Sequence, residues 1–362
     1  MFDKKYIFIG LLSIVICGSL AKAEAAPTAA LSQVIEAAKK EGALNVVLRS
    51  GFNQKSMDRL RKEIREKFGV DLDIKFTPGG SMPKHLSNAI MEHKLGAVPT
   101  FDLMNFSNHI VEGYEAGVFE RVDWKQLLLE GTPLEVVMDL PETRGSIIYF
   151  TGRQGVIYNS QKVPADKVPR MLKDLADPKW KGKVGVFEYP NSWSTWGAYL
   201  GDKEQVLPEL RGIMKNGAIV GTYVDLYNRF LLGEIAFNLT NSVYLKMAKD
   251  KGMPAAWQSM EISYVENFSL SVRKGAKHPN AAKLVSLYLA SPQGAKFTLE
   301  ESGAGNIYYP GNYEHDIAMQ DKRQGIREVF PEKDLKIIKF GRSEESRRLE
   351  KEVQLILAGA TR

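Results

Sequence analysis

The chain has 362 residues, of which 25% are charged and 44% are hydrophobic, and its formal net charge is +6. This composition is typical of a globular protein, and the length predicts about two domains. Cys17 is the only cysteine, and it lies in a segment that we expect to be removed, so the mature chain should lack disulfides, thiol nucleophiles and cysteine-based metal sites. The basic runs at 179–183 and 342–351 are short, and the second contains three glutamates, so we interpret them as solvated surfaces and predict no nucleic-acid binding.

The first residues have the three-part order of a bacterial secretory signal. Two lysines precede a fifteen-residue apolar run from Tyr6 to Leu20, and small residues follow at alternating positions up to residue 25. This run is shorter than the roughly 20 residues that a membrane-spanning helix needs. We therefore expect residues 1–25 to be a cleaved signal peptide and the mature protein to be a soluble monomer of the periplasm. A lipid anchor on Cys17 is the alternative, which Ile16 disfavours because a lipoprotein signal has a small residue there.

The first half of the mature chain alternates strands with helices. Residues 44–51 form an apolar run that ends in Ser-Gly, which predicts a buried strand followed by a loop. Apolar residues at helical spacing from Met57 to Phe68 predict a helix that Gly69 terminates, and residues 70–76 alternate like a half-buried strand. A helix from Ser81 to about Leu95 and a strand at 101–104 are expected next. This βαβ pattern predicts a mostly parallel sheet.

The pattern changes near residue 146, where Thr151 and Gly152 interrupt two apolar runs. We interpret this segment as the first crossing between two lobes, and the extended pattern at 262–272 as the return crossing. Strands at 183–187 and 234–239 predict a second α/β lobe. The predicted fold class is therefore α/β, with two lobes, a hinge and an interlobe cleft. Lobe 1 is expected to comprise residues 26–148 with 266–362, and lobe 2 residues 149–265.

The common catalytic and cofactor-binding motifs are missing from the sequence. There is no Gly-x-Ser-x-Gly elbow, no His-Glu-x-x-His helix, no Walker phosphate loop and no Gly-x-Gly-x-x-Gly turn. The five histidines are dispersed, which disfavours a metal or catalytic site. We therefore predict a non-enzymatic protein with no cofactor and no bound metal. A secreted hydrolase is the alternative from another functional class.

Polar residues follow the predicted strands, at the sheet edge where ligands of open α/β sheets bind. Hydroxyl groups, amides and helix N-termini can hold a polar or anionic solute there, although the same residue types also cap helices and form turns. Trp193 is the aromatic residue of the second lobe that we expect to reach the cleft, and we interpret most of the others as core. The predicted ligand-binding residues, whose loops should face one another across the cleft, are Ser50, Gly80, Asn105, Ser107, Arg153, Asn191, Ser192, Trp193, Asn241 and Ser242.

Five stretches resemble the type II periplasmic binding proteins related to the ferric-iron, thiamine and polyamine receptors. They are residues 151–159, 172–183, 233–237, 265–268 and 278–283, and the segment Asp-Pro-Lys-Trp-Lys-Gly-Lys at 177–183 is the most specific. The resemblance covers most of the mature chain. It implies two α/β lobes joined by a hinge, a ligand held between them, and delivery to an ABC permease and ATPase at the inner membrane.

The resemblance also bears on the ligand. Ferric-iron receptors of this group carry two adjacent tyrosines where this chain has Ser242 and Val243, and neither residue can replace a phenolate on iron(III). Polyamine receptors surround an amine with carboxylates and aromatic rings. The strand-end loops here are largely neutral, with Arg49 and Arg153 nearby and few acids beyond Glu188, Asp225 and Glu266. We therefore expect a receptor that captures a small polar or anionic organic solute by hinge closure. A ferric-iron or polyamine receptor is the alternative within the family.

Overall fold

The computed structural model describes residues 27–107, 109–201 and 204–359. Within these ranges it contains thirteen α-helices and ten β-strands, and none of these helices is long and apolar enough to span a membrane. The strands form one mixed sheet in the order β2-β1-β3-β9-β4-β7-β5-β6, to which β10 is added through β9 and β8 through β4. The predicted signal peptide, with Ile16 and Cys17, lies outside the described residues.

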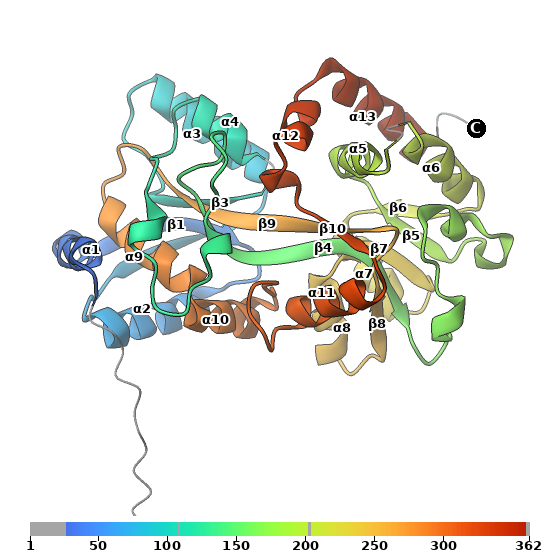
Figure 1. Cartoon of the computed structure of the whole chain (residues 1–362), viewed down its shortest axis with the longest axis horizontal. Coiled ribbons are helices and arrows are strands. Elements are labelled where there is room, and N and C mark those ends of the chain that lie inside the picture. The colour runs from blue at the N-terminus through green and yellow to red at the C-terminus, as the bar shows by residue number, and fades with distance from the viewer. Residues whose placement is uncertain (1–26, 108, 202–203, 360–362) are drawn as a thin grey trace, which may run out of the picture.

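Lobe 1 is built on three parallel strands with helices on both sides (Figure 1). The predicted βαβ unit is confirmed, because Ala43 pairs with Asp73 in parallel register and α2 connects the two strands. A capping box at Asn53 begins α2, and Gly69 ends it with a φ of 65°, a conformation that glycine adopts without steric cost. The elements are β1 (Ala43–Arg49), β2 (Asp73–Gly79), β3 (Leu103–Phe106), α1 (Ala29–Glu41), α2 (Gln54–Phe68), α3 (Met82–Lys94), α4 (Ile110–Glu115), α9 (Pro279–Ala290) and α10 (Pro292–Ser302).

Lobe 2 also contains parallel strands packed against helices, around a second hydrophobic core. Its strand β5 pairs in parallel with β6 and β7, and the side chains of Trp193 and Trp196 are completely buried beside them. The elements are β5 (Val184–Phe187), β6 (Ile219–Gly221), β7 (Phe237–Asn241), β8 (Ala255–Gln258), α5 (Pro190–Tyr199), α6 (Val206–Lys215), α7 (Tyr223–Leu231) and α8 (Val243–Asp250). The strands predicted at 183–187 and 234–239 are therefore present, with shifted ends.

Two long strands, β4 (Ile147–Asn159) and β9 (Ile262–Val272), cross between the lobes as an antiparallel pair. They are the crossings expected at 146–152 and 262–272. Strand β9 pairs with β3 in lobe 1, whereas β4 pairs with β7 in lobe 2, so the pair joins both sheets. The expectation of a mostly parallel sheet thus applies inside each lobe, while the hinge makes the complete sheet mixed.

The C-terminal segment packs differently from the expectation that residues 266–362 belong to lobe 1. Its elements are α11 (Tyr313–Arg323), β10 (Arg327–Val329), α12 (Leu335–Gly341) and α13 (Glu344–Leu357). Leu349, Val353 and Ile356 form an apolar stripe on α13 that is buried in the lobe 2 core. Helix α12 lies between the lobes, where Ile338 packs on the lobe 1 cluster that contains Val111 (Figure 1). The stripe can be read from the sequence, but the lobe that it covers cannot.

Candidate functional site

The crossing strands expose different side chains on their two faces. In the register of β4 and β9, Phe150 lies opposite Phe268, Gly152 opposite Glu266, and Gln154 opposite Tyr264. Side chains alternate between the faces of a strand, so these residues share one face, which we call the front face. Arg153 and Ser263 point to the opposite face, which we call the back face, where they are hydrogen-bonded to each other.

Glu266 is the central polar residue of the front face, and only 8% of its surface is exposed. Its carboxyl accepts hydrogen bonds from the Asn241 amide at 3.0 Å and the Gln154 amide at 3.4 Å. A Cβ on Gly152 would lie 2.7 Å from the Asn241 amide, so glycine at this position allows that amide to approach the strand. Burial, and next the nearby charge of Glu332, raise the pKa of Glu266 to about 8. Glu266 therefore carries a proton at neutral pH.

Arg49 supplies a cation from lobe 1, at the end of β1. Its guanidinium lies 5.0 Å from the ring centroid of Phe150, which stacks on Phe268 with 4.2 Å between ring centroids. The Nη1 atom of Arg49 is buried and has no hydrogen-bond partner among the described residues. Burial lowers the pKa of Arg49, and the neighbouring Tyr149, Tyr313 and Tyr244 act in the opposite direction. Because an arginine stays charged in proteins, this site holds a positive charge with an unused donor.

Four tyrosines of lobe 2 form a continuous wall next to Glu266 and Arg49. Ring centroids are separated by 4.8 Å between Tyr189 and Tyr223, by 6.0 Å between Tyr223 and Tyr244, and by 5.2 Å between Tyr244 and Tyr227. Burial raises the pKa of Tyr244 to about 12, while a smaller effect of Arg49 opposes this shift. The phenols are therefore protonated at neutral pH. Tyr227 is buried in the core, whereas Tyr189, Tyr223 and Tyr244 are half-buried and can offer ring faces and hydroxyl groups to a ligand.

A pocket of about 250 Å³ lies between the lobes, beneath α12. Lobe 1 lines it with Ile110 and Val111, and lobe 2 with Asn191, Thr195 and Tyr264, while Glu332 and Arg342 come from the C-terminal segment. Glu332 accepts hydrogen bonds from the backbone N–H of Asn267 at 3.2 Å and from its side-chain amide at 3.3 Å. Burial raises the pKa of Glu332 to about 7. The C-terminal segment thus closes part of the space between the lobes.

The predicted site residues are distributed over several environments. Asn241 reaches Glu266, and Asn191 lines the interlobe pocket. Asn105 and Ser107 are buried at the end of β3, and Ser192 is buried in α5, whereas Ser50 and Gly80 are exposed at strand ends. Three of the predicted residues lie away from the front face.

Trp193, Arg153 and Ser242 point away from the expected cleft. The Trp193 side chain is completely buried in the lobe 2 core, and its indole N–H donates to the Phe187 carbonyl at 3.0 Å. Arg153 is also completely buried, on the back face, and Ser242 donates its hydroxyl hydrogen bond to Glu314 there. The reason is strand and helix geometry: neighbouring residues point in different directions, so only some residues of a strand-end loop face the cleft.

Sequence reasoning did not select Tyr189, Tyr223 and Tyr244 as site residues and assigned most aromatic rings of lobe 2 to the core, which is correct for Tyr227. Tyr189 follows β5, Tyr223 begins α7 after β6, and Tyr244 lies in the first turn of α8 after β7. The strand-end rule that selected serines and asparagines therefore applies equally to these tyrosines. Arg49 is the last residue of β1 and was noted only as a nearby charge. Glu266 was noted only as one of the few acids near the strand-end loops, because its position beside Asn241 and Gln154 depends on the pairing of β4 with β9 and β7.

The model of the family described as bacterial extracellular solute-binding protein matches residues 114–324, which is more than half of the chain. The chain belongs to this family, and the resemblance to type II periplasmic binding proteins of the ferric-iron and polyamine group is confirmed. Proteins of this class are the solute-binding components of ABC transporters, which work with a membrane permease and an ATPase.

Several solved structures share the fold across nearly their whole length. The Trichodesmium protein IdiA (FutA), in complex with iron and citrate, has a TM-score of 0.64 and 18% identity, covering 86% of this chain and 99% of that one. The spermidine/putrescine-binding protein PotD of Streptococcus pneumoniae has a TM-score of 0.65 and 18% identity, with coverage of 87% and 99%. A substrate-binding protein of an ABC transporter from Agrobacterium tumefaciens has a TM-score of 0.68 and 11% identity, with coverage of 87% and 94%.

Proposed function

We propose that this protein is the periplasmic receptor of an ABC importer and that it captures a small anionic organic solute between its lobes. Closure would occur by bending of β4 and β9, and the loaded protein would deliver the solute to a permease and ATPase in the inner membrane. The observation that carries the ligand class is the buried, unpartnered Nη1 of Arg49.

The charge and shape of the site support an anion with an apolar or ring-shaped body. A buried guanidinium N–H without an acceptor is costly, and a carboxylate or phosphate oxygen would satisfy it with a charge-assisted hydrogen bond. Protonated Glu266 places no negative charge opposite such a ligand at neutral pH. The Phe150 and Phe268 stack and the Tyr189 and Tyr223 rings provide flat surfaces for the rest of the molecule. Asn241 and Asn191 remain the predicted polar contacts in lobe 2.

Iron(III) is the second candidate ligand, and the tyrosine wall is the observation that favours it. Phenolate oxygens are hard ligands suited to trivalent iron, and the Trichodesmium relative is named as an iron complex. Ser242 and Val243 do not supply phenolates, but Tyr244 directly follows Val243 and lies in the tyrosine wall. In the described residues no group of three or more His, Cys, Asp or Glu side chains could hold a metal, so iron would depend on the phenols. Both candidates use the same front face.

A thermal-shift screen of the mature protein separates the candidates, because a ligand that binds only the folded state raises the melting temperature. The panel contains succinate, citrate, glycerol 3-phosphate, spermidine and ferric citrate. We expect a small anion to stabilise the protein without iron. Stabilisation by spermidine alone contradicts the anion proposal, and a coloured phenolate-to-iron complex moves the assignment to iron.

Calorimetry of the best anion then tests Arg49. Loss of a charge-assisted hydrogen bond costs about 1.5–3 kcal/mol, so Arg49→Ala should weaken binding roughly 10- to 150-fold. Arg49→Lys retains the positive charge, so it should weaken binding less than Arg49→Ala. Lys181→Ala is the control, since Lys181 is an exposed cation of lobe 2 outside the site. Wild-type affinity in Arg49→Ala contradicts the proposed contact.

A further inference from the structure

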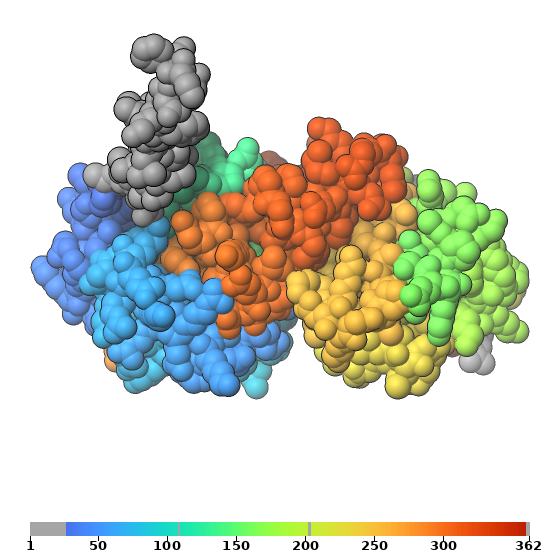
Figure 2. All heavy atoms as spheres, turned by 90° about the horizontal axis from the view of Figure 1, so that it is seen from below, coloured from blue at the N-terminus to red at the C-terminus, as the bar shows by residue number. Residues whose placement is uncertain are grey.

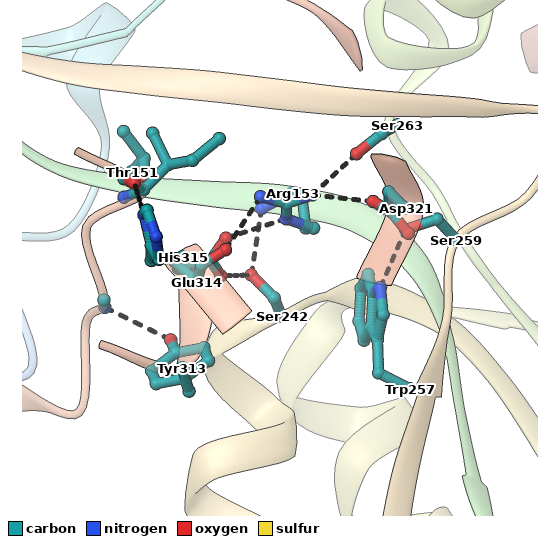
Figure 3. Close-up of polar contacts among 12 residues, drawn as sticks. Thr151, Arg153, Ser242, Trp257, Ser259, Ser263, Tyr313, Glu314, His315 and Asp321 are labelled. Carbon is teal, nitrogen blue, oxygen red and sulfur yellow. Dashed lines mark hydrogen bonds and ion pairs between the residues drawn. The ribbon is translucent and has the colours of Figure 1, made fainter. Parts of the chain in front are cut away.

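Helix α11 fixes a buried ionic network to the back face of the hinge strands. The Arg153 guanidinium donates from Nε to Glu314 Oε2 at 2.8 Å and from Nη1 to Asp321 Oδ2 at 2.7 Å (Figure 3). It also donates to Ser263 Oγ at 2.7 Å and to the Glu314 carbonyl at 3.0 Å. The side chains of Arg153, Glu314 and Asp321 are completely buried. Figure 2 shows that α10 and α11, coloured orange to red, cover the seam between the lobes on this side of the molecule.

The second carboxylate oxygen of Glu314 leaves this network and binds the strand-end loop of lobe 2. Glu314 Oε1 accepts the hydroxyl hydrogen bond of Ser242 (Figure 3). The same Ser242 hydroxyl accepts the backbone N–H of Arg153 at 2.9 Å, and the Ser242 N–H donates to the Arg153 carbonyl at 2.9 Å. Ser242 is thus clamped between β4 and α11 by its backbone and its side chain.

The clamped residue sits beside two front-face groups. Asn241 precedes Ser242 and donates its amide to Glu266, and its Oδ1 accepts the backbone N–H of Val243 at 3.1 Å. Tyr244 lies two residues after Ser242, in the first turn of α8. A shift of Ser242 would therefore move an amide and a ring of the proposed ligand site together.

We propose that Glu314 is a positioning residue of the binding site: by holding Ser242 from the back face, it orients the Asn241 amide and the Tyr244 ring on the front face. The effect on ligand affinity rests on the proposed function. The effect on the order of the loop does not, because it follows from contacts present without a ligand.

Asp321 provides a matched control within the same network. Asp321 Oδ2 accepts from Arg153 and from Ser259 at 2.8 Å, whereas its Oδ1 has no hydrogen-bond partner among the described residues. An Asp321→Asn side chain can keep its carbonyl oxygen at the Oδ2 position and place the amide group at the unpartnered position. In Glu314→Gln, Arg153 requires the carbonyl oxygen, so the amide group must face Ser242 and the hydroxyl loses its acceptor.

Hydrogen exchange of the ligand-free mature protein, read out by mass spectrometry, tests the proposal. In Glu314→Gln, the amides of residues 241–244 should lose protection by about tenfold, while β1 changes little, since the loss of one buried hydrogen bond opens the region locally. Asp321→Asn should stay within about twofold of the wild type in residues 241–244. Ser242→Ala removes the same contact from the other side, so adding Glu314→Gln to it should cause little further loss.

Three outcomes overturn the proposal. The first is unchanged protection at 241–244 in Glu314→Gln, and the second is an equal loss in Glu314→Gln and Asp321→Asn throughout the chain. The third outcome is full protection of residues 241–244 in Ser242→Ala. If Glu314→Gln does not fold, the Ser242→Ala variant alone tests the proposal. A failed ligand screen changes none of these readings, because no ligand is present in the exchange experiment.

Discussion

Glu266 and Glu314 are buried carboxyl groups on opposite faces of the same pair of crossing strands, and their surroundings differ. Glu314 is paired with the Arg153 guanidinium, whereas within the described part of the chain Glu266 receives side-chain hydrogen bonds only from the Asn241 and Gln154 amides. Burial raises the pKa of both groups, but at Glu314 the charge of Arg153 is the largest opposing effect. Removal of water thus leads to an ion pair on the back face and to a protonated acid on the front face.

The difference indicates that the two faces of the hinge strands have different roles. The back face satisfies every nitrogen of Arg153 with partners from α11 and β9, which fixes the strands relative to α11. Beside the front face, Arg49 Nη1 has no partner among the described residues, so this side has a donor available to a ligand, whereas on the back face the atom without a partner there is a carboxylate oxygen, Asp321 Oδ1.

The largest effect is expected from breaking the back-face ion pair. Arg153→Met should destabilise the protein by about 3–5 kcal/mol, because it leaves Glu314 and Asp321 buried without their cation. Urea unfolding followed by circular dichroism measures the change. Arg348→Met is the control, since Arg348 is an exposed arginine that pairs with Glu204, and solvent screening makes such surface pairs contribute little to stability. Similar losses in both variants would contradict the assigned role of the back face.

The next largest effect is a pH dependence of protein stability that arises from Glu266 on the front face. Glu266 has a pKa of about 8 in the folded protein and an ordinary value of 4.5 when unfolded, so the folded state binds the proton more tightly. Its contribution to stability is complete below pH 4.5 and is lost as the pH rises through 8. Stability should therefore fall between about pH 5 and 8 by an amount on the order of a few kcal/mol. In Glu266→Gln this fall should be smaller.

Unfolding curves recorded from pH 5 to 8.5 measure this dependence. Glu332→Gln is a companion variant, because the pKa of Glu332 is raised to about 7 and its loss of stability has the same sign. Parallel curves for the wild type and Glu266→Gln would mean that Glu266 does not carry the proton assigned to it.

The smallest effect concerns the contact of α12 with lobe 1. Arg342 pairs with Glu115 of α4, and both side chains are about half exposed. A double-mutant cycle should give a coupling of about 0.2–1 kcal/mol that decreases with added salt. Because this pair links the lobes, Arg342→Ala should also lengthen the distance between spin labels on the two lobes. Arg348→Ala removes a pair within lobe 2, so it should leave that distance unchanged.

Much of the fold follows from local sequence patterns. The apolar runs near 146–158 and 262–272 predicted the crossing strands, and the alternation after Gly69 predicted β2. The site was less predictable. Gln154 and Arg153 are neighbours, and the period of a strand separates them onto opposite faces, but it does not say which face α11 covers. For the same reason the strand-end rule found Asn241 on the front face together with Ser242 on the back face.

By itself, the sequence determined the order of strands and helices, the two crossings and the family, because helix period, strand period and turn residues act over a few neighbouring positions. Tertiary structure decided which lobe α13 covers, which face of β4 became the back, and that four separate tyrosines join one wall. These outcomes depend on contacts between residues far apart in the chain. Arg153 meets Glu314 across 161 positions, and no local pattern in the sequence encodes that pairing.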